Sequence, residues 1–135
     1  MGPQVQMVAD ALGGAAKVAA DYFAALDGEL ESIQPLLSPD LVFEAVNGTR
    51  IAGAENYVAA LKRLAPILRR HDVKRIWADG DQVCVIYDFV TDTAEGAIPS
   101  VEWITMAQGK IARIELIFHS HPWPAVLQEL ARRNA

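Results

Sequence analysis

Hydrophobic residues in the first part of the chain recur at steps of three and four positions. From Gln4 to Leu26 this spacing predicts a helix with one apolar face, which Gly13 and Gly14 weaken. The same spacing from Glu29 to Leu37 predicts a second, short helix, and Ser38-Pro39 would end it. The chain therefore begins with two helices that each need a surface to cover them.

A hairpin and a third helix follow. Leu41–Val46 is typical of a strand, and Asn47-Gly48 predicts a type I′ turn, in which both central residues take a positive φ. Thr49–Ala52 is the expected returning strand. The spacing from Ala54 to about Leu68 predicts another helix, and Pro66 should bend it or end it early.

The second half of the chain is dominated by strands. Four are expected at Val73–Ala78, Gln82–Thr91, Ile98–Ala107 and Ile111–Ser120, and a short helix at Ala125–Arg133. The connections are of hairpin length, so these strands should be antiparallel neighbours. The whole chain, residues 1–135, is expected to form one α+β domain.

Both faces of the predicted strand Gln82–Thr91 are largely apolar. A sheet with only one covered face would alternate apolar and polar residues, so the outer face should pack on something as well. We expect a homodimer, because a twofold pairing buries the same patch on both copies. The outer face of the long strands carries Cys84, Ile86, Val90, Val101, Trp103, Ile117 and His119.

Composition narrows the class of protein. Of 135 residues, 52% are hydrophobic and 21% charged, which is typical of a globular domain, and the net charge of -5 gives no reason to expect a nucleic-acid partner. The single cysteine, Cys84, excludes an internal disulfide. No signal-peptide pattern and no apolar run long enough for a membrane span are found, so we expect a cytoplasmic protein without a membrane partner.

The stretch from Asp21 to Gly53, DYFAALDGELESIQPLLSPDLVFEAVNGTRIAG, gives the order helix, break, short helix, strand and turn. With the strands that follow, it resembles the cone-shaped family of nuclear transport factor 2, ketosteroid isomerase and SnoaL-type polyketide cyclases. The resemblance implies N-terminal helices packed on a strongly curved, mostly antiparallel sheet that encloses a cavity for a small apolar molecule. The residues expected to line this cavity are Phe43, Ala45, Tyr57, Tyr87, Phe89, Ile104, Leu116 and Phe118.

The same resemblance assigns two hydrogen-bond donors. Tyr22 matches the oxyanion-hole tyrosine of the isomerases, and Glu102, in SVEWITM, matches their second donor, a carboxylic acid that stays protonated. The general-base aspartate of that family falls on Ala45. Glu44 beside it should point to the other face of the strand, unless a bulge turns it inward.

Other chemistry finds less support. The limonene epoxide hydrolases resemble the same cone, but their arginine and their last-strand acid fall on Ser100 and Leu116. In SnoaL-type cyclases an acid–base residue lies near His119, whose parity with Ile117 points it outward. His119 and His121 have no firmly placed third ligand, and His71 lies on a different strand, so no metal and no cofactor are expected.

Two functional hypotheses remain open at this point. One is an enzyme of isomerase or cyclase type, in which Tyr22 and Glu102 donate hydrogen bonds to a developing enolate. The other is a non-catalytic module that binds a ligand or a protein, as nuclear transport factor 2 does. The sequence identifies neither the substrate nor the pathway.

Overall fold

The order of helices and strands agrees with the order predicted from the sequence. The computed structural model describes residues 14–135, so the part of the first predicted helix before Gly14 lies outside the described residues. The elements are α2 (Gly14–Leu26), the 3-10 turn η1 (Leu30–Leu36), β1 (Leu37–Ala45), β2 (Arg50–Ala52), α3 (Ala54–Leu64), the 3-10 turn η2 (Ala65–Ile67), β3 (Leu68–Asp79), β4 (Gln82–Thr91), β5 (Ala97–Ala107), β6 (Lys110–Phe118) and α4 (Trp123–Arg133).

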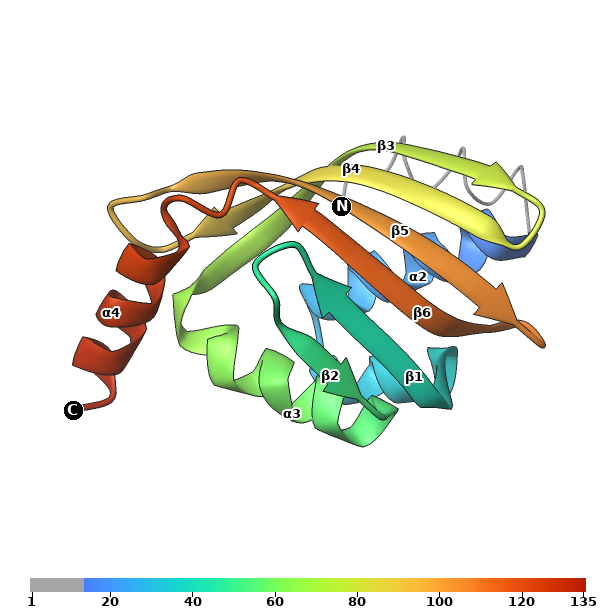
Figure 1. Ribbon diagram of the computed structural model, residues 1–135, viewed down its shortest axis with the longest axis horizontal. Coiled ribbons are helices and arrows are strands. Elements are labelled where there is room, and N and C mark those ends of the chain that lie inside the picture. The colour runs from blue at the N-terminus through green and yellow to red at the C-terminus, as the bar shows by residue number, and fades with distance from the viewer. Residues whose placement is uncertain (1–13) are drawn as a thin grey trace.

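All six strands belong to one sheet with the order β2-β1-β6-β5-β4-β3. Neighbouring strands are antiparallel except for β1 and β6, which run parallel. The sheet arches over α2 and α3, and α4 lies at one end of the molecule (Figure 1). This is the expected α+β cone.

Several boundaries differ from the prediction because tertiary pairing extends the strands. Strand β1 begins at Leu37, not at Leu41, and its register with β6 is broken between Leu37 and Val42. Pro39 falls in this irregular stretch, where its missing N–H interrupts no regular ladder. Strand β3 begins at Leu68, not at Val73, because its N-terminal half pairs with the end of β4. Pro66 ends helix α3 early, as predicted.

The hairpin at Asn47-Gly48 is confirmed, but the predicted turn type is wrong. Gly48 has a φ of +94°, whereas Asn47 does not take a positive φ. The N–H of Gly48 donates to the carbonyl of Ala45 at 3.0 Å, and the N–H of Thr49 donates to the side-chain oxygen of Asn47 at 3.2 Å. The turn therefore needs one left-handed residue, and a glycine supplies it.

Alternation along β5 separates the inner face of the sheet from the outer face. Ser100, Glu102 and Ile104 are buried, while Pro99 and Trp103 are exposed. Together with the apolar side of α2, the inner residues form the core. None of the described helices is long and apolar enough to cross a membrane.

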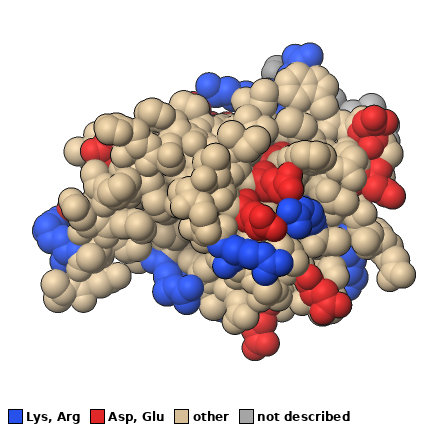
Figure 2. Space-filling model, in the orientation of Figure 1, with Lys and Arg blue, Asp and Glu red and all other residues tan. Residues whose placement is uncertain are grey.

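The surface carries charges of both signs. On the face shown in Figure 2, acidic and basic side chains alternate near the middle and are surrounded by broad uncharged areas. Strands β1, β2 and β6 carry an ion-pair cluster, in which Arg113 contacts Glu44 at 3.0 Å and Glu115 at 2.9 Å, and Arg50 contacts Glu44 at 3.7 Å. Such interspersed pairs leave no large field of one sign on this face.

Candidate functional site

A cavity of about 480 Å³ lies between the inner face of the sheet and helices α2, α3 and α4. Its size is in the range of small-molecule pockets, and its walls are mainly apolar with a few polar groups. The lining residues are Tyr22, Leu26, Phe43, Ala45, Asn47, Thr49, Ile51, Tyr57, Ala60, Leu61, Arg63, Leu64, His71, Tyr87, Phe89, Ser100, Glu102, Leu116, Phe118, Trp123, Leu127 and Leu130.

Three tyrosines and one glutamate form a polar cluster at the buried end of this cavity. The hydroxyl of Tyr87 donates to Glu102 Oε2 at 2.5 Å, and the hydroxyl of Tyr22 donates to Glu102 Oε1 at 3.4 Å. The hydroxyls of Tyr22 and Tyr57 share a further hydrogen bond. All four side chains are at most 3% exposed. The helices α2 and α3 and the strands β4 and β5 thus bring four oxygen-bearing groups to one point.

Burial controls the protonation of this cluster. It raises the pKa of Glu102, although the hydrogen bonds from Tyr87 and Tyr22 and the nearby His71 act in the opposite direction. Burial and the proximity of Glu102 also raise the pKa of Tyr22, Tyr57 and Tyr87 well above that of an ordinary tyrosine. The tyrosines therefore keep their protons, and Glu102 keeps its own to a higher pH than an exposed glutamate.

An Asp27–His71 pair lies beside this cluster. His71 Nδ1 is 2.6 Å from Asp27 Oδ1, and the backbone N–H of His71 donates to both carboxylate oxygens, at 3.0 and 2.9 Å. Burial alone would raise the pKa of Asp27, but the hydrogen bonds from the side chain and backbone of His71 outweigh it and lower that pKa. Asp27 is therefore an acceptor, which makes Nδ1 the donor.

This arrangement leaves the other ring nitrogen of His71 available to the cavity. The imidazole is 4% exposed, lines the cavity and lies against the rings of Phe23, Tyr87 and Phe89. Nε2 has no hydrogen-bond partner among the described residues. Every fully buried polar side-chain atom of those residues has a partner, so Nε2 is not fully buried and is accessible from the cavity. In the neutral imidazole Nε2 carries the lone pair, so it can accept a proton from a molecule in the cavity.

Most residues expected at the cavity from the sequence are found there. Of the eight apolar and aromatic candidates, seven line it: Phe43, Ala45, Tyr57, Tyr87, Phe89, Leu116 and Phe118. Ile104 is not among the lining residues. Its side chain lies on the inner face of the sheet and is fully buried in the core. It is the next inward-facing residue after Glu102 along β5, and it is paired with Val83 of β4 and Ile114 of β6.

Neither Glu44 nor His119 supplies the base that is missing at Ala45. Ala45 lines the cavity but has no ionisable group. Glu44 points away and is ion-paired with Arg113 and Arg50, so no bulge turns it inward. His119 is exposed and, like His121, does not line the cavity; their rings are 6.3 Å apart, and no group of three potential metal ligands occurs among residues 14–135.

Sequence reasoning missed the Asp27–His71 pair. In the sequence Asp27 lies in the break after the first helix, and His71 lies two residues before the predicted strand Val73–Ala78. The two residues are separated by 44 positions, and no local pattern connects them. The alternation of His71 with Val73 on one face of the longer strand is the one signal that could have directed the imidazole inward.

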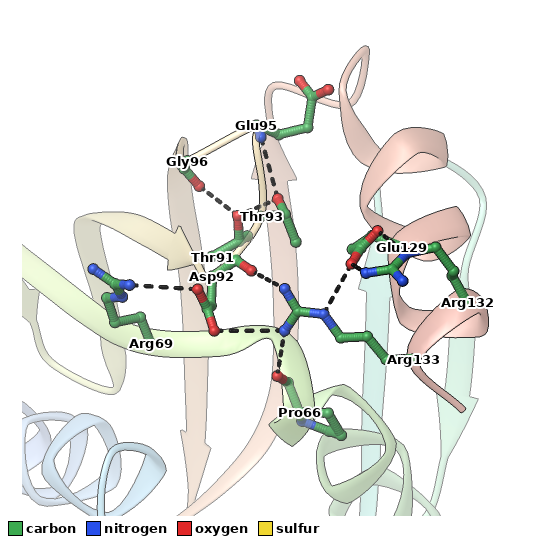
Figure 3. A network of polar contacts seen from close by, with 10 residues as sticks. All are labelled: Pro66, Arg69, Thr91, Asp92, Thr93, Glu95, Gly96, Glu129, Arg132 and Arg133. Atoms are coloured by element: carbon green, nitrogen blue, oxygen red, sulfur yellow. Dashed lines mark hydrogen bonds and ion pairs between the residues drawn. The ribbon is translucent and has the colours of Figure 1, made fainter. Parts of the chain in front are cut away.

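Helix α4 closes one side of the cavity with Trp123, Leu127 and Leu130. Arg133 attaches this helix to the rest of the domain, as Figure 3 shows: it donates to the carbonyls of Pro66, at 3.1 Å, and Asp92, and pairs with the Asp92 carboxylate at 3.5 Å and with Glu129 at 3.0 Å. The helix is thus held at both its apolar face and its C-terminal end.

The chain belongs to the SnoaL-like domain family. The family model matches residues 19–114, which is more than half of the chain and includes every member of the polar cluster as well as Asp27 and His71. No curated protein matches the chain significantly. The resemblance inferred from the sequence is therefore confirmed at the level of the family.

Solved structures agree on the fold. A protein from Kribbella flavida DSM 17836 is 25% identical, with a TM-score of 0.71 over 87% of this chain and 95% of that one. A steroid delta-isomerase from Pseudomonas aeruginosa is 22% identical, with a TM-score of 0.71 over 88% and 90% of the two chains. An LEH-like epoxide hydrolase from M. tuberculosis is 21% identical, with a TM-score of 0.68 over 85% and 90%. These similarities establish the cone-shaped fold. Any reaction has to be inferred from the residues of the site.

Proposed function

We propose that this protein binds a small, largely apolar molecule in the cavity and moves a proton on it, with His71 as the base. The observation that carries the proposal is the 2.6 Å contact between His71 Nδ1 and Asp27 Oδ1 in the wall of the cavity. It fixes the ring so that Nε2 carries the lone pair, which is the arrangement that a general base needs.

The polar cluster supplies the second half of this reaction. His71 Nε2 takes a proton from a carbon next to a carbonyl, and the electron pair of the C–H bond moves onto the carbonyl oxygen. Tyr22, turned from Glu102 to the ligand, donates a hydrogen bond to that oxygen as it becomes negative, and Glu102 donates a second one when it carries its proton, in a site that excludes most water. The imidazolium then returns a proton to the same carbon or to a conjugated one, which gives exchange or isomerisation.

This assignment supplies the base that Ala45 lacks, from a different wall of the cavity. The steroid delta-isomerase from Pseudomonas aeruginosa and the LEH-like epoxide hydrolase share the fold. An isomerase among the similar structures supports the enzyme hypothesis more than the hypothesis of a binding module. The proposal therefore places this chain with the isomerase- or cyclase-type members of the fold.

Solvent exchange tests the proposal without knowledge of the natural substrate. The protein is incubated in D2O with a small enolisable ketone such as 2-tetralone, and deuterium at the α-carbon is followed by NMR. We expect catalysed exchange, and a fall of about 100-fold or more in His71→Gln, because general-base catalysis typically contributes that much. His119→Gln is the matched control, since this imidazole is exposed and outside the cavity. Equal exchange in native protein and His71→Gln would contradict the proposal.

A second candidate function is binding without catalysis, as in a module of the nuclear transport factor 2 type. The observation that favours it is the outer face of the sheet, where Trp103 is 49% and Ile117 is 56% exposed. Apolar area of this kind marks association surfaces. Binding of apolar ketones without any catalysed exchange would select this function over the first.

A further inference from the structure

Arg63 is the one side chain with a permanent positive charge among the residues that line the cavity. It lies in the last turn of α3 and is exposed, whereas Tyr22, Tyr57 and Glu102 are buried. Asn47 and Thr49, from the β1–β2 turn, are the other exposed polar residues of the lining. With Leu127 they are the exposed residues of the lining, and we call this solvent-facing part the mouth of the cavity.

Arg63 differs from the other arginines of residues 14–135 in having no partner. Arg50, Arg69, Arg70, Arg113, Arg132 and Arg133 each form an ion pair with an acidic side chain. Arg75 lies over the ring of Trp77 at 5.4 Å. In this part of the chain, Arg63 alone has neither an acid nor a ring within reach, and it is the arginine that faces the cavity.

The cavity itself offers Arg63 no negative charge. Glu102 is the one acidic residue of the lining; it is at the buried end, and burial raises its pKa. The sides between the two ends are formed by apolar residues such as Phe43, Leu61 and Leu116. A molecule that fits this distribution has an apolar body, an oxygen at its inner end and an anionic group at its outer end.

We propose that the ligand is an amphipathic carboxylate, with its carboxylate bound by Arg63 at the mouth and its carbonyl or hydroxyl oxygen at the Tyr22–Glu102 cluster. Arg63 presents several N–H donors in a planar fork that matches a carboxylate, and the amide of Asn47 and the hydroxyl of Thr49 add donors at the same rim. This inference rests on the proposed ligand site and specifies its substrate class.

A pair of matched probes tests it by binding alone. 6-Hydroxy-2-naphthoate has a hydroxyl at one end and a carboxylate at the other; its methyl ester keeps the rings and the hydroxyl, adds one methyl group and carries no charge. Dissociation constants for both are measured by calorimetry with the native protein, with Arg63→Gln and with Lys62→Gln. Lys62→Gln is the control, because it removes the same charge from the neighbouring position, where the lysine pairs with Glu31 at 2.8 Å and does not line the cavity.

We expect the acid to bind the native protein about tenfold more tightly than the ester, as a charge-assisted hydrogen bond at a partly exposed site provides. The preference should disappear in Arg63→Gln and persist in Lys62→Gln. Equal affinities in the native protein, a preference that survives Arg63→Gln, or no binding of either probe would each overturn the inference. Because proton transfer is not measured, equal affinities in a protein that still catalyses exchange would overturn the substrate class alone and leave the proposed function standing.

Discussion

The individual residues of the site divide into those that the family resemblance identified and those that only the structure brought together. Tyr22 and Glu102 were matched to hydrogen-bond donors from the sequence, and the structure joins them directly by a 3.4 Å contact. Tyr57 and Tyr87 were expected only as cavity walls, yet their hydroxyls complete the same cluster. An aromatic residue at core spacing shows where its ring lies, but the position of its hydroxyl depends on partners far along the chain.

The ionisation of Glu102 should make the free energy of unfolding depend on pH. Burial raises its pKa in the folded state, so the folded protein binds this proton more tightly than the unfolded chain does. Its contribution to stability is then complete below the unfolded pKa of about 4.3 and is lost as the pH rises through the higher folded pKa. Glu102→Gln cannot ionise, so the variant should gain melting temperature relative to the native protein as the pH rises from about 4 to 7.

Thermal unfolding of both proteins over this pH range measures the effect, and Glu95→Gln, at an exposed loop position, is the control. A constant difference between native protein and Glu102→Gln at every pH would show that Glu102 ionises as freely as an exposed glutamate.

Among the elements, the sequence predicted the helices and the central strands best. Strand β4 was predicted with its observed limits, Gln82–Thr91, because continuous apolar alternation defines a strand in the middle of a sheet. The early end of α3, at Leu64, follows from Pro66, which lies in the next 3-10 turn. Where local chemistry decides the structure, one sequence is enough to predict it.

The edges of elements were harder to predict, because pairing partners decide them. The first part of β3, Leu68–Asp72, contains polar residues that do not resemble a strand, yet it pairs with β4 from Thr91 to Asp88. His71 lies in this stretch, so the error in the strand boundary was also the reason why the candidate base was missed. Likewise α4 begins at Trp123, not at Ala125, and so its first residue reaches the cavity.

For the whole molecule, the outer face of the sheet remains to be explained. Trp77, Trp103 and Ile117 are 48–56% exposed, which is unusual for large apolar side chains on a small domain. We expect this face to form a homodimer, as the alternation of the strands predicted. The site is complete within one chain, so dimer formation should change stability more than it changes chemistry.

Trp103→Glu tests this expectation. In a twofold interface near this residue, the two copies of the new carboxylate repel each other and lose water on association. The variant should therefore be monomeric at concentrations where the native protein is a dimer, which corresponds to a loss of about 100-fold or more in dimer affinity. Sedimentation velocity at micromolar concentration distinguishes the two states. Gln128→Glu is the control, because it adds one negative charge at an exposed position of α4, which lies at one end of the molecule (Figure 1). A native protein that is monomeric under these conditions would show that the apolar face serves another partner.

The central claim for the molecule is that Asp27 holds His71 with its basic nitrogen toward the cavity. Long-range ¹H–¹⁵N NMR spectra of the imidazoles measure this directly, and His71→Gln assigns the signals. At about pH 8, where an ordinary imidazole is neutral, we expect His71 to carry its proton on Nδ1 and this preference to be lost in Asp27→Asn. A proton on Nε2 in the native protein, or the same tautomer in Asp27→Asn, would contradict it.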